Sequence, residues 1–201
     1  MTAVKICGIT RREDADAAVA FGADAVGFVL WPSSPRRTTI GVAGAIVRDL
    51  PPFVTPVGVF VNPSADDIAA AADAGVRVAQ VHGIVPAGPV RLPLLRAVHL
   101  HVDGAGRIEP EVTDGTVLLD AHDPVRHGGT GQTVDWVAAR AVAARRRIVL
   151  AGGLTAGNVS DAIKMVMPYA VDVASGVETE PGIKDPLKLR AFIDAVRSTG
   201  T

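Results

Sequence analysis

The residues best suited to acid-base chemistry in this chain stand at the ends of short apolar segments. Cys7, the only cysteine, lies in Lys5–Thr10, where an apolar strand is expected to run into a glycine turn. Asp120 ends the apolar segment 116–119. A carboxyl group whose pKa is raised by burial can act as a general acid, and a thiol whose pKa is lowered toward neutrality can act as a base. The two residues therefore form a complementary pair if the fold brings them together.

Each of these residues also has a purely structural explanation. A lone cysteine is more often a small buried apolar side chain than a nucleophile or base. Asp120 is followed by Asp123 and Pro124, so it also fits a turn or a helix N-cap. The polar residues and glycine turns at the other expected strand ends favour an acid-base role for Cys7 and Asp120.

Short apolar or β-branched segments alternate with alanine-rich amphipathic segments along the chain. The expected strands are 3–7, 24–29, 54–60, 76–81, 96–101, 115–120, 147–151 and 170–174. The expected helices are 11–21, 39–49, 64–74, 133–144, 156–167 and 185–197, with N-caps at Thr10, Ser64, Thr133 and Thr155. Eight successive β-α units predict a single α/β domain over residues 1–201, folded as a (β/α)8 barrel.

Two of the covering segments are poor helix formers. Residues 84–95 carry three prolines, and residues 102–114 carry two glycines and a proline. Both residue types disfavour a helix interior. We therefore expect short or irregular covering after strands four and five.

Reactive groups of such barrels gather at the carboxyl ends of the strands. The polar or aromatic residues expected there, besides Cys7 and Asp120, are Trp31, Arg36, Gln80, His82 and Asp172. An arginine such as Arg36 can hold a carboxylate through two parallel hydrogen bonds, although it also fits a solvated loop.

Three glycine-rich turns follow or precede these strands, at residues 128–131, 151–153 and 174–176. Glycine lets backbone N–H groups approach a phosphate, and a following helix start adds a partial positive charge. A single glycine turn usually only changes the chain direction. Turns after strands seven and eight are, however, a frequent phosphate site in barrel enzymes. The sequence therefore predicts a phosphorylated ligand.

The composition argues against several partners. Lys and Arg number 20 against 21 Asp and Glu, so a net charge of −1 offers no field for nucleic acid or an anionic membrane. Residues 145–147 are three arginines at an expected helix end, where cations are favourable. One cysteine, no signal-like leader and no long apolar segment predict a reducing, cytoplasmic setting.

Taken in order, these segments resemble the phosphoribosylanthranilate isomerases, (β/α)8 enzymes of tryptophan biosynthesis, over nearly the whole chain. The resemblance is carried by Lys5–Thr10, Gly22–Phe28, Ser34–Arg36, Gly58–Asn62, Gln80–Gly83, Leu118–Asp120, Gly128–Gly131, Asp135–Trp136, Ala151–Leu154, Val171–Glu178 and Pro181–Asp185. The reduced covering segments depart from the family pattern, which leaves a monomer or a homodimer open.

The resemblance implies an Amadori rearrangement of N-(5-phosphoribosyl)anthranilate to 1-(2-carboxyphenylamino)-1-deoxyribulose 5-phosphate, without a metal or an organic cofactor. Asp120 resembles the general acid, Cys7 the base, and Arg36 the group that holds the anthranilate carboxylate. Further positions that match the family near the substrate are Gln80, His82 and Asp172. The positions that resemble its phosphate site are Gly129, Thr130, Gly131, Gly152, Gly153, Ser175 and Gly176.

Other functions remain open for the same residues. A different phosphosugar enzyme is the main alternative, since the barrel and its phosphate turns serve many substrates. A barrel that binds a phosphorylated ligand without turnover is a further alternative. A related isomerisation in histidine biosynthesis relies on paired aspartates, so Cys7 favours the anthranilate substrate.

Two alternatives depend on other side chains. A Schiff-base enzyme is disfavoured because no lysine stands at an expected strand end, and Lys5 precedes one. A metal-dependent epimerase could use His99 and His101, which share one face of strand five, with His82 or Asp120 as a further ligand. Paired histidines more often pack or form hydrogen bonds.

Overall fold

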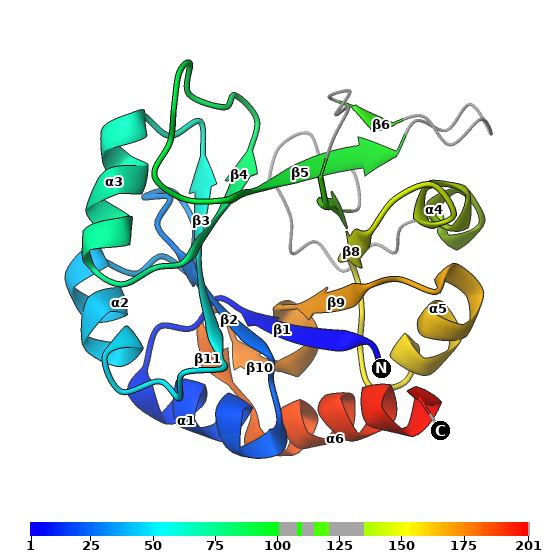
Figure 1. Cartoon of the computed structure of the whole chain (residues 1–201). Coiled ribbons are helices and arrows are strands. Elements are labelled where there is room, and N and C mark those ends of the chain that lie inside the picture. The colour runs from blue at the N-terminus through cyan, green and yellow to red at the C-terminus, as the bar shows by residue number, and fades with distance from the viewer. Residues whose placement is uncertain (101–107, 110–114, 121–134, 201) are drawn as a thin grey trace.

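The strands of the molecule form a barrel inside a partial ring of helices (Figure 1). The computed structural model describes residues 1–100, 108–109, 115–120 and 135–200. Within these ranges, eight parallel strands pair in a closed circle, since β9 pairs with β1 and β4 pairs with β5. The predicted (β/α)8 barrel is therefore confirmed.

Each expected strand is present, with ends shifted by a few residues. The parallel strands are β1 (Ala3–Cys7), β2 (Ala25–Val29), β3 (Thr55–Val61), β4 (Val78–His82), β5 (Leu94–Leu100), β7 (Val117–Asp120), β8 (Ile148–Leu150) and β9 (Ala170–Val173). Most of their side chains are buried, as expected for strands with the barrel interior on one side and helices on the other.

The helices that cover the barrel are all amphipathic or apolar and lie at the expected places. They are α1 (Arg12–Phe21), α2 (Ile40–Val47), α3 (Ala65–Asp73), α4 (Trp136–Ala143), α5 (Val159–Val166) and α6 (Pro186–Arg197), with the short 3-10 helices η1 (Ser175–Val177) and η2 (Ser198–Gly200). On α6, Leu189, Phe192, Ile193 and Val196 are buried against the barrel.

Helix starts were predicted less well than the helices. Ser64 caps α3 with a full capping box, as predicted. Thr10 does not cap α1, because its hydroxyl donates to the carbonyl of Gly182 (2.5 Å). Thr155 does not cap α5, since Asn158 precedes that helix. Thr133 lies outside the described residues, and Asp135 caps α4.

The covering is incomplete where the sequence lacks helix formers. The described chain between β4 and β5 contains no helix, and Figure 1 shows this connection as a loop. After β5, the described residues include only β6 (Ile108–Glu109), which pairs antiparallel with β5. The expected irregular covering after strand four is thus confirmed, and most of that after strand five lies outside the described residues.

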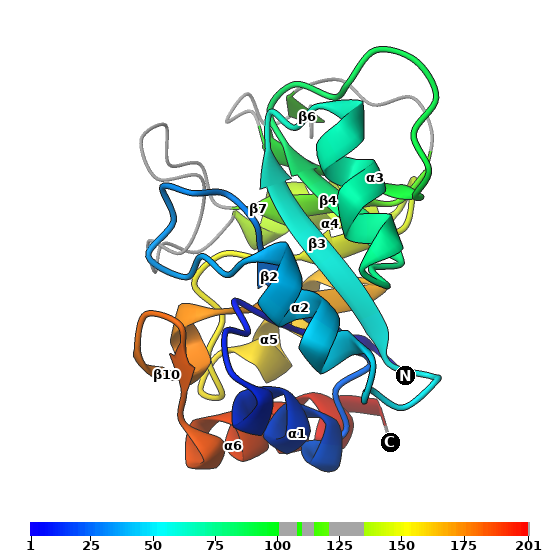
Figure 2. The same ribbon diagram turned by 90° about the vertical axis from the view of Figure 1, so that its left-hand side faces the viewer.

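A short hairpin, which the expected elements do not include, follows β9. It consists of β10 (Glu178–Glu180) and β11 (Ile183–Lys184), which pair antiparallel across Pro181 and Gly182. In Figure 2, β10 projects from the same side of the barrel as the loop after β2. The hairpin therefore brings residues late in the chain to the loop that carries Arg36.

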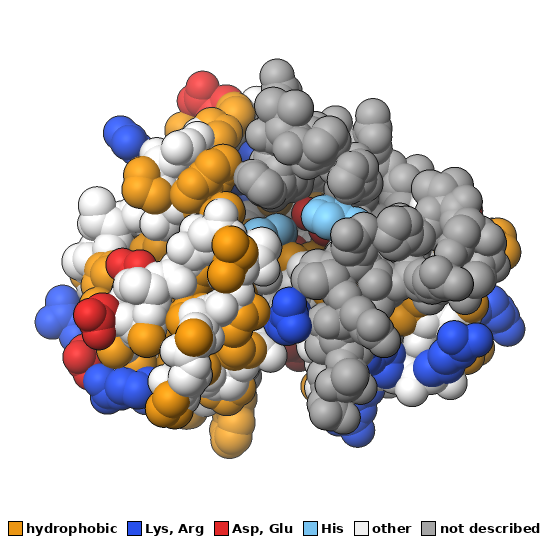
Figure 3. Space-filling view, turned by 90° about the horizontal axis from the view of Figure 1, so that it is seen from above, with side chains coloured by type: hydrophobic (Ala, Val, Ile, Leu, Met, Phe, Trp, Pro, Cys, Tyr) orange, Lys and Arg blue, Asp and Glu red, His pale blue; other side chains and the backbone are white. Residues whose placement is uncertain are grey.

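The upper face of the molecule, in Figure 3, bears scattered Lys and Arg side chains, most of them near its edges and one near its middle. The described residues of this face form no basic stripe. No helix in the described ranges has the length and hydropathy needed to cross a membrane.

Two leucines of α6 provide a matched test of its packing. Leu189 is fully buried, whereas Leu187, two residues earlier, is 80% exposed. We expect Leu189→Ala to lower the free energy of unfolding by about 2–5 kcal/mol, because it leaves a cavity in the core. Leu187→Ala should change that free energy by less than about 0.5 kcal/mol. Urea unfolding followed by circular dichroism measures both, and equal losses would contradict the packing of α6.

Candidate active site

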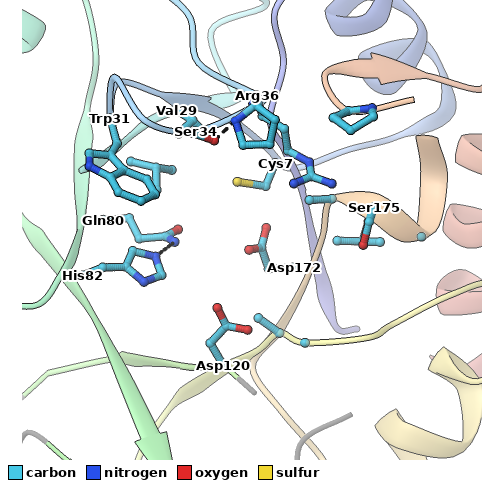
Figure 4. A pocket seen from close by; sticks show the side chains of 18 of the residues that line it. Cys7, Val29, Trp31, Ser34, Arg36, Gln80, His82, Asp120, Asp172 and Ser175 are labelled. Atoms are coloured by element: carbon cyan, nitrogen blue, oxygen red, sulfur yellow. Dashed lines mark hydrogen bonds between the residues drawn. The ribbon is translucent and has the colours of Figure 1, made fainter. Parts of the chain in front are cut away.

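A pocket of about 440 Å³ opens at the carboxyl ends of the strands. Cys7 at the end of β1 and Asp120 at the end of β7 both line it, and Figure 4 shows their side chains pointing into the same space from different sides. Both residues are nearly buried, at 7% exposure each. The predicted acid and base are therefore brought together by the fold.

Cys7 stands above a buried ion pair inside the barrel. Lys5, two residues earlier on the same face of β1, places its Nζ 2.8 Å from Oδ1 of Asp172 on β9. A Cβ on Gly27 would lie 3.0 Å from both the Cys7 Sγ and the Lys5 Nζ. The thiol and the ammonium therefore occupy the space that a side chain at position 27 would fill.

The Cys7 thiol lies in a buried and charged environment that shifts its pKa. Burial is the largest influence and raises this pKa above its ordinary value. The nearby ammonium of Lys5 lowers the pKa of Cys7, whereas the Asp172 carboxylate raises it further. Desolvation of the thiolate therefore outweighs the favourable charge of Lys5, and the pKa of Cys7 is not lowered toward neutrality.

Arg36 lines the pocket but grips a carboxylate of the protein itself. Its Nε lies 3.0 Å from each carboxylate oxygen of Glu178, and its Nη2 lies 2.8 Å from Oε2. Lys184 places its Nζ 2.7 Å from Oε1 of the same carboxylate and 2.6 Å from the carbonyl oxygen of Cys7. Arg36, Glu178 and Lys184 therefore form one charge cluster beside the end of β1.

Gly8 leaves the space in which the Arg36 side chain lies. Its φ of +78° lies in the left-handed region, and a Cβ there would stand 2.9 Å from the Arg36 Cδ. The glycine after Cys7 is thus required both by the turn and by the arginine side chain that lies against it.

Gln80 and His82 line the opposite side of the pocket from Arg36 (Figure 4). The Gln80 Nε2 and the His82 Nε2 are 2.9 Å apart and hydrogen-bonded. Both side chains are buried on β4, and their mutual bond fixes their orientation toward the pocket. Asp172, the remaining predicted polar residue, also lines the pocket.

Two of the three predicted glycine turns meet at the pocket. Gly152, Gly153, Ser175 and Gly176 all line it. Gly152 and Gly153 have φ angles of +84° and +61°, and a Cβ on Gly176 would collide with the carbonyl oxygen of Leu154. The turns after β8 and β9 therefore need glycine and are packed against each other. Gly129, Thr130 and Gly131 lie outside the described residues.

The family model of N-(5'phosphoribosyl)anthranilate (PRA) isomerase matches residues 4–195. The chain belongs to this family. It is a PRA isomerase, which converts phosphoribosylanthranilate to the carboxyphenylamino-deoxyribulose phosphate in tryptophan biosynthesis.

The match extends to individual relatives over their full length. The chain is 47% identical to the N-(5'-phosphoribosyl)anthranilate isomerase of Pelobacter propionicus, over 99% of this chain and 97% of the relative. The crystal structure of the Thermus thermophilus isomerase superimposes with a TM-score of 0.83 at 37% identity and covers 98% of this chain and 99% of its own. A PRA isomerase in complex with reduced 1-(o-carboxyphenylamino)-1-deoxyribulose 5-phosphate has a TM-score of 0.79 at 35% identity, over 98% and 100% of the two chains.

Three buried charged residues that contact the lining of the pocket were not predicted: Lys5, Glu178 and Lys184. Lys5 could have been found, because a charge two residues before Cys7 on an apolar strand shares its face. Glu178 and Lys184 flank Pro181-Gly182, a dipeptide typical of a tight turn, which predicts a hairpin that brings the two together.

The raised pKa of Cys7 can be measured by alkylation. Since this is the single cysteine, mass spectrometry of iodoacetamide-treated native protein reports it alone. We expect the alkylation rate to rise with pH to a midpoint above that of a free cysteine, about 8.5. In Lys5→Met the midpoint should rise further, because an ammonium that favours the thiolate is removed. A midpoint below that of N-acetylcysteine, measured alongside, would contradict this.

Proposed function

We propose that this PRA isomerase works through Asp120 as general acid and Cys7 as general base. The observation that carries the proposal is their position in one pocket, at the ends of β7 and β1, with Arg36 and two glycine turns around them. A buried carboxyl group and a thiol with a cation nearby are suited to giving and taking one proton each.

The first step opens the sugar ring. Asp120 in its acid form gives its proton to the furanose ring oxygen, the bond from this oxygen to C1 breaks, and the nitrogen lone pair forms an iminium with C1. Cys7 as thiolate then removes the proton from C2. The electron pair of that C–H bond forms the C1–C2 double bond and neutralises the nitrogen, and the enolamine tautomerises to the ketone.

Lys5 supports the second step electrostatically. Burial lowers the pKa of Lys5, but Asp172 and Cys7 together outweigh it and raise that pKa, so the ammonium stays charged. A fixed positive charge next to Cys7 favours the thiolate form that a base requires. Asp172 binds Lys5 through Oδ1, and we assign its other oxygen to a substrate hydroxyl.

The remaining predicted residues bind the substrate in this proposal. Arg36 holds the anthranilate carboxylate, while Gln80 and His82 face the substrate from β4. The phosphate is bound by the turns at Gly152, Gly153, Ser175 and Gly176, together with Gly129, Thr130 and Gly131. Reduced 1-(o-carboxyphenylamino)-1-deoxyribulose 5-phosphate carries the same groups and is therefore expected to bind here.

Two substitutions test the acid and the base. We expect Cys7→Ala and Asp120→Asn each to lower kcat by about 10² to 10⁴, the usual contribution of one positioned acid or base. The decay of substrate fluorescence measures turnover, and binding of the reduced product shows whether the pocket is intact. Asp161→Asn, an exposed carboxylate on α5, is the matched control and should turn over normally. Normal turnover in either site variant would remove that residue from its role.

The phosphate turns are tested by Gly176→Ala. Its new Cβ would push against the Leu154 carbonyl and separate the two turns. We expect the inhibition constant of inorganic phosphate to rise at least about tenfold, since charge-assisted hydrogen bonds of this kind contribute about 1.5–3 kcal/mol. Gly157→Ala is the control, because the nearest atom to its Cβ is 3.8 Å away. Unchanged phosphate inhibition in Gly176→Ala would place the phosphate elsewhere.

The state of assembly and the location in the cell also remain predictions. We expect a monomer or a homodimer, which light scattering distinguishes. A cytoplasmic location is supported by the single cysteine and the source of the substrate in amino-acid biosynthesis.

A further inference from the structure

The guanidinium group of Arg36 presents two edges, and Glu178 uses one of them. Nε and Nη2 form the side edge, and both donate to the Glu178 carboxylate. The end edge consists of Nη1 and the second hydrogen of Nη2, and it finds no partner among the described residues. Because a guanidinium has five N–H donors in a rigid plane, one arginine can serve two carboxylates at once.

The Glu178 carboxylate is itself held from several sides. Besides Arg36, it accepts from Nζ of Lys184 (2.7 Å) and from the backbone N–H of Gly182 (3.2 Å). The side chain of Lys184 is fully buried, and that of Glu178 is 4% exposed. The Glu178 carboxylate is therefore held by groups of its own hairpin as well as by Arg36.

We propose that Glu178 is a positioning residue for carboxylate recognition: it holds Arg36 by the side edge and thereby aims the end edge at the substrate carboxylate. This rests on the proposed function of Arg36. Lys184 donates both to the Glu178 carboxylate, which binds Arg36, and to the Cys7 carbonyl. It thereby connects Arg36 to the end of β1, which carries the proposed base.

The charges of the cluster suit this role. Burial alone would raise the pKa of Glu178, but the hydrogen bonds and charges of Arg36 and Lys184 outweigh it and lower that pKa. Burial lowers the pKa of Lys184, and Glu178 opposes this. With one carboxylate between two cations, the cluster keeps a net positive charge that favours an anion in the pocket.

Two ligands distinguish an effect of Glu178 on the orientation of Arg36 from an effect on the stability of the whole protein. One is reduced 1-(o-carboxyphenylamino)-1-deoxyribulose 5-phosphate, and the other is the same compound with phenyl in place of carboxyphenyl. The ratio of their dissociation constants, measured by calorimetry, isolates recognition of the carboxylate. It is compared in the unchanged protein, Glu178→Gln, Arg36→Met and the control Glu180→Gln, an exposed glutamate of the same strand.

In the unchanged protein we expect the carboxylate to strengthen binding about ten- to hundredfold. The ratio of the two dissociation constants should fall close to one in Arg36→Met. It should drop about tenfold in Glu178→Gln, and it should stay unchanged in Glu180→Gln. If Glu178→Gln weakens both ligands equally while Arg36→Met abolishes the preference, the aiming role of Glu178 is wrong and the role of Arg36 stands. If Arg36→Met also keeps the preference, both assignments fail.

Glu178→Gln leaves the buried ammonium of Lys184 without its carboxylate, which threatens folding. The double variant Glu178→Gln with Lys184→Met removes that charge while it leaves Arg36 without its support. The same drop in the ligand ratio is expected in it, relative to Lys184→Met alone. A preference equal to that of Lys184→Met would overturn the proposal.

Discussion

The barrel closes where β9 returns to β1, and a buried ion pair spans this closure. Lys5 and Asp172 are register partners of the two strands, and their charged atoms are 2.8 Å apart inside the barrel. To leave either charge buried alone would cost about 3–5 kcal/mol, so a shifted register is strongly disfavoured. The pair thereby fixes the height of Cys7 relative to the turn after β9, and the geometry of the pocket depends on it.

Two glycines shape the pocket by leaving space for neighbouring side chains. Gly27 on β2 leaves room for the Cys7 thiol and the Lys5 ammonium, and Gly8 leaves room for the stem of Arg36. Cys7, Lys5 and Arg36 thus each lie against a neighbouring glycine. Because interiors are close-packed, one added methyl group at either position would displace a functional atom.

The sequence was sufficient for the strands, the helices and the strand ends that line the pocket, although not for every helix cap. Apolar segments predicted the strands, and the strand-end rule of barrels located Cys7, Arg36 and Asp120 at the pocket. Contacts between distant segments were not predictable in this way. Thr10 bonds to a residue 172 positions away instead of capping its helix, and Glu178 meets Arg36 across 142 positions. The direction of the shift in the Cys7 pKa was not predictable from the sequence either, because it depends on how deeply the fold buries the thiol.

The hairpin after β9 affects the entropy cost of ligand binding, because it holds Arg36 in place. Lys188 on α6 donates to the Glu178 carbonyl (2.8 Å), while Lys184 bonds to the end of β1. The hairpin, the first strand and the last helix are therefore bound together as one rigid support for Arg36. In the proposed role of Arg36, binding of the substrate carboxylate costs little rotamer freedom at this arginine, because its ordering entropy is already lost when the chain folds. By that proposal, part of the free energy of folding becomes affinity for the substrate.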